Sequence, residues 1–536
     1  MAGAKTGFVR EATGLVRELG LVDTMAINLF AAGPISGVFV PVLMGSLFPG
    51  ASIYGVLIIG AFFGIFNGLV YALLSAAMPR AGGDYVYNGR ILHPAVGFMS
   101  SWGFTISQFL ILAIGTNLLL TTILSQAFYT IGLQASNSAL ESLGSVIVAS
   151  PLNTWLVGAA VLIIVILIVA LPIHWFGRVI SAALVIGLVG GLATPLVLLA
   201  YSHASFVSIF DSFMVKQTGV SNAYSTIIST AQSKGFVEGG NSIAEAVLAI
   251  PIGYFIFVGF TWSSYAAGEI KNAAKTQLRA IELSLFIAWA YLMVMLGQYY
   301  NLVGSVFNDA AVYLSNNYPT LYPIPVGPSV SFFAGLLAPD IVVNIVMQSA
   351  IILFLVFSLV SIALVCVRSI FAWSFDRAFP AIFASVSAKG SPWIATVFTG
   401  IGALILLAIY EFTTFFTLTV NYTVIFSVVF FITSFSAILF PFRRKDLFSS
   451  SPGIVTRKVA GIPLIVLMGA IQLILFAAIL YTSFLLPAFS GPTGGSAVAF
   501  IVGIYATGFA GFWIAWWYRK RSGVDLTLLH REIPPE

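Results

Sequence analysis

The run Ala31-Ala32-Gly33-Pro34-Ile35-Ser36-Gly37 interrupts the first long apolar segment of the chain. Glycine lowers helix stability, and proline lacks an amide donor and clashes with the preceding turn, so this run breaks the hydrogen-bond ladder of a helix. A second run, Phe257-Val258-Gly259-Phe260-Thr261-Trp262-Ser263, stands in the sixth apolar segment, shortly after Pro251 and Gly253. Both segments therefore predict helices that unwind in their middle.

The composition indicates that these breaks lie in a membrane protein. Of the 536 residues, 59% are hydrophobic and 8% are charged, which leaves too little polar surface for a soluble fold. The chain is therefore predicted to be an all-α integral membrane protein. Twelve segments are long enough to cross a hydrocarbon core that needs about 20 apolar residues. They lie at 24–47, 53–78, 95–129, 154–171, 176–201, 246–268, 281–304, 341–371, 393–411, 413–442, 460–486 and 497–518.

A broken helix has a restricted place in a membrane. Because an unpaired backbone group is costly in hydrocarbon, the break persists only where it is buried in protein or lines a water-filled cavity. Matching breaks in two halves of a chain are typical of the binding site of a secondary transporter. A plain proline kink in an ordinary helix is the alternative.

The distribution of Lys and Arg predicts the orientation, because cytoplasmic loops carry an excess of both. Twelve spans put both termini on one side. If that side is the cytoplasm, only Lys216 and Lys234, 2 of the 23 basic residues, lie outside. We expect a multi-pass protein of the plasma membrane, in contact with the lipid bilayer and with both termini cytoplasmic. The net charge of +5 then reflects topology rather than nucleic-acid binding.

Two segments outside the predicted spans differ from them in composition. Residues 1–22 interleave apolar with charged side chains, which suits a cytoplasmic amphipathic helix at the membrane surface. Residues 204–244 form a long extracellular loop rich in Ser, Thr and Asn, in which short helices are expected.

The sequence lacks the residues that other functions of a membrane protein would need. The single cysteine, Cys366, excludes an intramolecular disulfide and a cysteine-based metal cluster. A membrane enzyme needs clustered His, Asp, Glu or Cys at membrane depth, whereas the four histidines are scattered near span boundaries and tails. These are His93, His174, His203 and His530. A membrane enzyme, a sensor and a channel are therefore the weaker alternatives, and we expect no cofactor, no metal beyond a coupling ion and no obligate protein partner.

Three motifs carry a resemblance to a known family. Residues 78–87, Met-Pro-Arg-Ala-Gly-Gly-Asp-Tyr-Val-Tyr, resemble the Pro-x-Ala-Gly-Gly-x-Tyr signature of the amino acid-polyamine-organocation (APC) permeases. Residues 266–272 are similar to the family's Ala-Ala-Glu-Glu-x-Lys-Asn-Pro, with Gly268 and Ala273 replacing Glu and Pro. Residues 368–380 look like a stretch of the family in which Arg, Asp and Pro stand at the spacing of Arg368, Asp376 and Pro380. The matches run from the first span to residues 441–444.

The resemblance implies the LeuT-like fold of that superfamily. Its members have ten core helices in a 5+5 inverted repeat, with helices 1 and 6 unwound around the substrate, plus two peripheral helices. In this chain the repeats would occupy 23–203 and 245–445. Accessory helices would follow at 446–518, and a cytoplasmic tail at 519–536.

The two breaks also indicate what is bound. A half-helix that begins near Ser36 would present unpaired amides and the positive end of its dipole, which suits a carboxylate. Carbonyl ends near Ala31 and Gly259 would suit an ammonium group. A zwitterion fits both ends, so we expect a permease for neutral or zwitterionic amino acids that works by alternating access. A polyamine or organic amine permease, or an amino-acid exchanger, is the alternative.

The candidate substrate-binding residues all come from the two breaks. Related permeases use the first break as Gly-Ser/Thr-Gly, and Ile35 stands here at the first glycine. Thr261 stands where some members with cationic substrates carry an acidic residue, which disfavours a strongly basic substrate. The aromatic candidates could equally be packing residues. The candidates are Ala32, Gly33, Pro34, Ile35, Ser36, Gly37, Phe257, Gly259, Phe260, Thr261 and Trp262.

The coupling ion is Na⁺ or H⁺, or there is none. No central position of the predicted spans holds an ionisable residue, which is the usual mark of a proton carrier. Ser358 and Ser361, with the Ala31 carbonyl, could supply oxygen ligands for Na⁺, although serines in spans also bond to preceding carbonyls. We therefore expect a Na⁺ symporter or an exchanger without ion coupling.

A set of charged residues lies at the predicted cytoplasmic ends of the spans. These residues could form a charge-paired inner gate, or they could be topology-setting charges in solvated loops. They are Arg80, Asp84, Lys271, Arg368, Asp376 and Arg377.

Overall fold

The computed structural model describes residues 14–240, 243–324, 326–387, 390–415, 422–485 and 494–529. Within these residues, 11 helical segments are long and apolar enough to cross a membrane. They confirm an all-α multi-pass membrane protein, whereas the count of twelve spans stays a prediction. The spans are Leu21–Leu47, Ile53–Ala77, Pro94–Ala135, Pro151–Val169, Ile173–Leu199, Ala273–Val303, Ile341–Phe375, Trp393–Phe412, Val424–Arg443, Leu464–Ser483 and Val498–Arg521.

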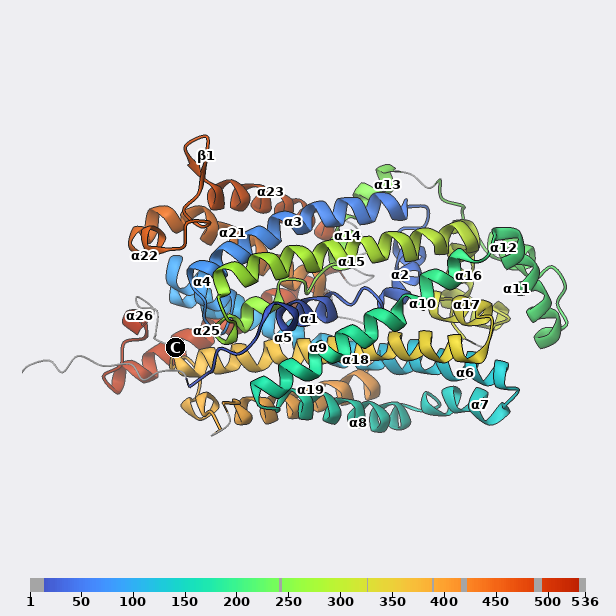
Figure 1. Cartoon of the computed structure of the whole chain (residues 1–536), viewed down its shortest axis with the longest axis horizontal. Helices are drawn as coiled ribbons and strands as arrows, with labels where there is room; N and C mark the ends of the chain where they lie inside the picture. Colours follow the sequence, from blue (N-terminus) through green and yellow to red (C-terminus); the bar gives the residue numbers. More distant parts are fainter. Residues whose placement is uncertain are drawn as a thin grey trace, which may run out of the picture.

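The helices of the first half follow one another with short connections (Figure 1). They are α1 (Leu21–Ala32), η1 (Gly37–Phe39), α2 (Val40–Leu47), α3 (Ile53–Ala77), α4 (Asp84–Ile91), α5 (Pro94–Leu118), η2 (Leu119–Leu124), α6 (Ser125–Ala135), α7 (Ser138–Ile147), α8 (Pro151–Val169), α9 (Ile173–Gly191), α10 (Ala193–Leu199), α11 (His203–Thr218) and α12 (Ala223–Ser233). Two of them, α11 and α12, lie in the predicted loop 204–244.

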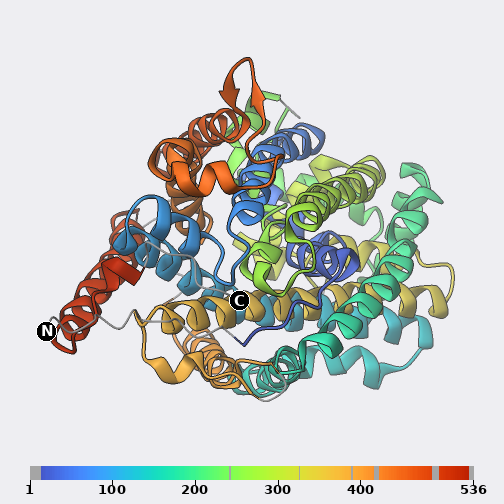
Figure 2. The same ribbon diagram turned by 60° about the vertical axis from the view of Figure 1, so that its left-hand side comes forward.

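The second half adds more helices and a short hairpin. Its elements are α13 (Ile243–Leu248), α14 (Ile250–Phe255), η3 (Trp262–Tyr265), η4 (Ala267–Glu269), α15 (Ala273–Val303), α16 (Ser305–Asn317), η5 (Pro319–Leu321), α17 (Val330–Leu337), α18 (Ile341–Phe375), η6 (Ala381–Ala384), α19 (Trp393–Phe412), α21 (Tyr422–Arg443), α22 (Lys445–Ser450), β1 (Lys458–Val459), β2 (Ile462–Pro463), α23 (Leu464–Leu485), α25 (Gly494–Arg521) and α26 (Leu526–Leu529). Helices α23 and α25 bury the smallest share of their residues among the spans, and α25 stands at the edge of the bundle (Figure 2).

The sixth predicted segment, 246–268, is the one that forms no long helix. It consists of the short α13 and α14, a run of turns over 256–261, and two short 3₁₀ helices. The first predicted segment is broken between α1 and α2. Both segments that the sequence predicts to unwind are therefore interrupted in the structure.

A glycine stripe on α3 holds this helix against the sixth segment and α15. A Cβ placed on Gly60 would come within 2.0 Å of the Gly253 carbonyl oxygen, and one on Gly64 within 2.8 Å of a methyl carbon of Leu285. Gly68 completes the stripe at the same spacing of four. Such small-residue stripes let helix backbones approach closely in membranes, where packing replaces the hydrophobic drive for association.

The two ends of the bundle are built differently (Figure 1). We call them the α4 end, where α4, α22 and α26 lie, and the α16 end, where α11, α12 and α16 lie. At the α16 end, the Gly50 N–H donates to Asp309 Oδ2 across 3.1 Å. Because Gly50 follows α2 and Asp309 is on α16, this bond ties the outer part of the first span to α16.

The segment before α1 corrects one expectation. The amphipathic helix predicted for 1–22 is absent from residues 14–20, which have no helical turn, and residues 1–13 lie outside the described residues. The backbone here pairs with the end of the sixth segment instead. Leu19 N–H donates to Glu269 O, and Lys271 N–H donates to Leu19 O, both at 2.9 Å. These ladder bonds take up groups that a helix would use internally.

Candidate functional site

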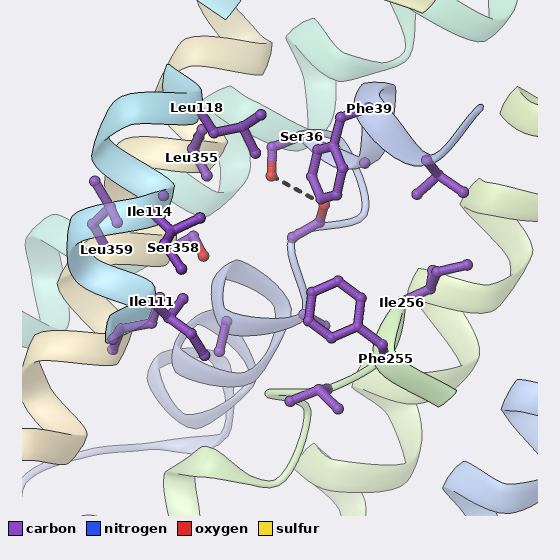
Figure 3. A pocket seen from close by; sticks show the side chains of 18 of the residues that line it. Ser36, Phe39, Ile111, Ile114, Leu118, Phe255, Ile256, Leu355, Ser358 and Leu359 are labelled. Carbon is purple, nitrogen blue, oxygen red and sulfur yellow. Dashed lines mark hydrogen bonds between the residues drawn. The ribbon is translucent and has the colours of Figure 1, made fainter. Parts of the chain in front are cut away.

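The first break begins at Gly33 and ends at Gly37. Gly33 adopts a φ of 58°, in the left-handed region that favours glycine, and its N–H closes α1 onto Leu29 O at 2.9 Å. The Ser36 hydroxyl donates to Gly33 O across 3.1 Å (Figure 3). The amides of Ile35 and Ser36 thus lie between two helical segments and outside both, as a half-helix start requires.

The second break touches the first. Gly259 has a φ of 113°, and a Cβ placed on it would come within 2.4 Å of the carbonyl carbon of Ala31. One helix turn before Ala31, Asn28 accepts a hydrogen bond at Oδ1 from the Ser263 N–H, at 2.8 Å. The two unwound segments are therefore packed backbone against backbone in the interior.

A cavity of about 120 Å³ lies at this junction (Figure 3). Its polar side chains are Ser36, Ser358 and the indole of Trp262, and none of its lining side chains is ionisable. The rest of the wall is apolar or backbone. The lining consists of Ala31, Ala32, Gly33, Ser36, Gly37, Phe39, Val40, Ile111, Ile114, Gly115, Leu118, Phe255, Ile256, Val258, Trp262, Leu292, Leu355, Ser358, Leu359 and Ile362.

Two buried ion pairs lie toward the α4 end. Arg368 on α18 contacts the Glu269 carboxylate at 2.9 Å, and both side chains are at most 3% exposed. Arg90 on α4 contacts Asp376 at 2.9 Å with equally little exposure. The pairs join α18 to the end of the sixth segment and to the connection between the second and third spans.

The glycine motif at 81–83 also docks on the sixth segment. Gly82 N–H donates to Tyr265 O at 2.9 Å, and a Cβ on Gly83 would come within 2.9 Å of the Tyr265 ring. The Tyr265 hydroxyl donates to Asp84 Oδ1. Burial raises the pKa of the Asp84 carboxyl to about 7. The motif therefore closes the α4 end around the inner part of the sixth segment.

Comparison with known proteins identifies the family. The profile described as amino acid permease matches residues 19–509. The chain belongs to the amino acid permease family. This confirms the resemblance to APC permeases, and the family points to transport of amino acids or related organic cations.

One curated relative adds little about function. A stretch of 78 residues of the permease is 33% identical to Uncharacterized protein 399 of Sulfolobus islandicus rod-shaped virus 1. This stretch is 15% of the permease, and it spans a fifth of the length of that protein.

The cavity brings together part of the predicted substrate set. Ala32, Gly33, Ser36, Gly37 and Trp262 line it. The other predicted residues are not in the lining: Pro34, Ile35, Phe257, Gly259, Phe260 and Thr261.

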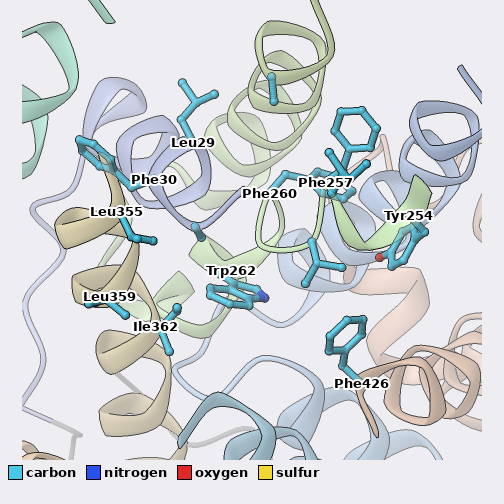
Figure 4. Close-up of a cluster of buried hydrophobic side chains, with 14 of the residues drawn as sticks. Leu29, Phe30, Tyr254, Phe257, Phe260, Trp262, Leu355, Leu359, Ile362 and Phe426 are labelled. Carbon is cyan, nitrogen blue, oxygen red and sulfur yellow. The ribbon is translucent and has the colours of Figure 1, made fainter. Parts of the chain in front are cut away.

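The excluded residues have structural roles. Ile35 is fully buried against α9, where a Cβ on Gly191 would meet its Cδ1 at 2.2 Å, so this side chain points away from the cavity. A bulky residue at the position of the first motif glycine is therefore compatible with the break. Phe257 and Phe260 lie in the buried apolar cluster of Figure 4 and pack against the glycine stripe of α3.

Sequence reasoning missed the apolar wall of the cavity. Helix α5 contributes Ile111, Ile114 and Leu118, and α18 contributes Leu355 and Leu359. Apolar residues in a span look alike in sequence whether they face lipid, protein or a cavity. No local signal distinguishes these five.

The gate candidates differ in their burial and in the partners that they contact. Arg368 and Asp376 form buried pairs, but with Glu269 and Arg90, which the prediction omitted. Lys271 is exposed, which favours the solvated-loop interpretation for this residue. Arg80 donates to the Pro79 carbonyl at 3.2 Å. The carbonyl of Arg377 accepts from Arg519 Nε at 3.2 Å.

Two of the three coupling-ion candidates line the cavity. Ala31 and Ser358 line the cavity, whereas Ser361, one turn farther along α18, does not. Ser361 is fully buried, and its Oγ has no hydrogen-bond partner among the described residues.

One ionisable residue lies farther from the end of its span than the sequence predicts. Helix α15 begins at Ala273, well before the predicted span at 281–304. The prediction left out the first turns of the helix because they carry polar residues such as Lys275 and Gln277. Glu282 therefore lies more than two turns inside a membrane-spanning helix rather than at its end.

Proposed function

We propose that the permease moves neutral or zwitterionic amino acids across the plasma membrane by alternating access, with both termini and the α4 end in the cytoplasm. The observation that carries this proposal is the cavity between the two breaks. Its lining holds hydroxyls, an indole and unwound backbone, but no ionisable side chain. A substrate with a net charge would leave that charge uncompensated in a buried site, at a large desolvation cost.

The backbone supplies the polar contacts for such a substrate. The amides around Ile35 and Ser36, at the start of η1, suit the carboxylate, and the Ala31 carbonyl at the end of α1 suits the ammonium group. The side chain would then lie along the apolar wall of α5 and α18, at Ile114 and Leu359. This division gives polar recognition of the common part and apolar tolerance of the variable part.

The buried ion pairs support the access mechanism. Arg368 with Glu269 and Arg90 with Asp376 hold the α4 end closed around the sixth segment. If the substrate is to leave on the cytoplasmic side, both pairs must separate. Exit then requires a movement of α18 relative to the sixth segment, which is the rocking expected of such transporters.

The alternative substrates would need a different binding site. A polyamine or organic amine permease would stabilise its cation with a carboxylate, and the lining has none. Thr261 carries a hydroxyl instead of a carboxylate, and it is buried outside the lining. An amino-acid exchanger would use the same cavity, and it differs from a uniporter or symporter only in needing substrate on both sides.

Uptake into proteoliposomes tests the proposal. Purified permease is reconstituted, and saturable uptake of labelled alanine, leucine, arginine and putrescine is compared with that into protein-free liposomes. We expect saturable uptake of alanine or leucine and at least tenfold less of arginine and putrescine. Saturable uptake of arginine or putrescine alone would establish the amine-permease alternative. Uptake only with substrate preloaded inside would establish the exchanger.

A further inference from the structure

Glu282 lies on one face of α15, nine residues from its start at Ala273, or about 13 Å along the helix axis. The same face carries Leu285, Phe286 and Trp289, at the helical spacing of three and four residues. These side chains line a groove of about 490 Å³ against α3. Helices α3 and α15 lie side by side in Figure 1.

The carboxyl group has no polar partner. Its Oε1 is buried and makes no hydrogen bond, and Glu282 forms no ion pair in the part of the chain that the structure describes. Every other residue in the groove lining is uncharged. On α15 itself, Arg279 and Lys275 are exposed and lie one and two turns nearer the α4 end.

These surroundings favour a carboxyl group that holds its proton. An ionised carboxylate in apolar surroundings is strongly disfavoured unless a cation or hydrogen-bond donors compensate it. Here the groove offers the carboxyl group no cation, and the groove faces outward on the bundle, where Phe62 and Phe286 are exposed. The neutral acid is therefore the form that fits this conformation.

A single glycine, Gly68, lies between the carboxyl group and the second break. A Cβ placed on Gly68 would meet Glu282 Oε1 at 2.6 Å and Phe260 Cε2 at 3.0 Å. Phe260 directly follows Gly259, which packs on Ala31 of the first break. A movement of the sixth segment relative to α3 would thus change the space and the water access around the carboxyl group.

We propose that Glu282 is the proton-binding residue of a proton-coupled permease. It carries one proton while the second break is packed against Gly68, and it releases the proton when that packing opens and water reaches the carboxylate. This inference rests on the proposed function and adds its coupling ion. It also replaces the expectation of Na⁺ coupling or uncoupled exchange, whose premise was that no central position of a predicted span holds an ionisable residue.

The test compares proton movement with substrate movement in the same proteoliposomes. A trapped pH-sensitive dye reports internal acidification on addition of the preferred amino acid, and counterflow of labelled substrate reports binding and translocation without a gradient. We expect acidification with the unmodified permease and at least tenfold slower acidification with Glu282→Gln. Counterflow should change by less than twofold. Glu282→Asp should restore acidification, and Glu238→Gln, at an exposed position, should leave both signals unchanged.

Three results would overturn the proposal. The first is acidification by Glu282→Gln at the unmodified rate. The second is accumulation by the unmodified permease that an inward Na⁺ gradient drives without acidification. The third is loss of counterflow in both Glu282 variants, which would assign the residue to folding or substrate binding. If the unmodified permease shows neither uptake nor counterflow of any amino acid, the proposed function itself fails.

Discussion

Gly259 and Ala31 pack so closely that a Cβ on the glycine would come within 2.4 Å of the alanine carbonyl carbon. The contact joins the two breaks, which are more than two hundred residues apart in the chain. It also excludes every side chain other than hydrogen at position 259, because the glycine φ of 113° is itself strained for other residues.

Replacement of this glycine should separate the breaks. We expect Gly259→Ala to reduce amino-acid uptake at least tenfold and to destabilise the permease by about 1–3 kcal/mol from backbone strain alone. Uptake by proteoliposomes and thermal unfolding in detergent measure the two effects. Gly503→Ala is the matched control, because a Cβ there meets nothing within 4 Å. Normal uptake by Gly259→Ala would contradict the packing of the two breaks.

The Arg368–Glu269 pair should behave as a buried ion pair. Arg368→Met or Glu269→Gln leaves one uncompensated charge in the interior, and each should cost about 3–5 kcal/mol. The double variant removes both charges, so its apparent melting temperature should exceed that of either single variant. Arg457→Met, at an exposed position, is the control. A double variant that melts below both singles would show that these side chains are not a coupled pair.

Asp84 should make stability depend on pH. Burial raises the pKa of this carboxyl from 3.8 in its ordinary state to about 7, so the folded protein binds the proton more tightly than the unfolded chain does. The resulting stabilisation is fully present below the ordinary pKa of 3.8, and it is lost progressively as the pH rises to about 7. Melting temperatures between pH 5 and 8.5 should therefore fall for the unmodified permease.

The variant Asp84→Asn tests the assignment to this residue. The amide cannot ionise, so the fall in melting temperature up to about pH 7 should become smaller. Glu238→Gln should retain the full fall. An unchanged pH profile for Asp84→Asn would show that another group is responsible.

The apolar wall of α5 should set the size of the substrate side chain. Ile114→Ala enlarges the cavity, so uptake of leucine relative to alanine should rise by about tenfold, which is typical of a pocket altered by a few methylene groups. Ile163→Ala, which truncates an exposed isoleucine on α8, is the control. A ratio that does not change would place the substrate side chain elsewhere.

The breaks and the family could be predicted because backbone chemistry is local. Gly33 and Pro34 disfavour a helix whatever surrounds them, and the structure does end α1 at Gly33. The motif at 81–83 could likewise be recognised from adjacent residues. The resulting expectation of an all-α multi-pass permease is confirmed.

Partners across the bundle could not be predicted in this way. Arg368 was identified, but its partner Glu269 lies 99 positions away, and nothing local connects the two. The same limit applies to Ile35, whose direction depends on the space beside Gly191. Glu282 was missed for another reason, since a search for apolar length cuts off the polar first turns of α15.

The backbone pairing of Leu19 with the residues around Ile270 has a consequence for biogenesis. Chains are synthesised at about 5–20 residues per second, so roughly 13 to 50 seconds pass between the two strands of this pairing leaving the ribosome. During that interval the segment before α1 lacks its partner, and the break at the other end of α1 is not yet covered by Gly259. The cell must therefore shelter an incomplete helix until the sixth segment arrives, and a chain stalled before residue 259 would present that end to quality control.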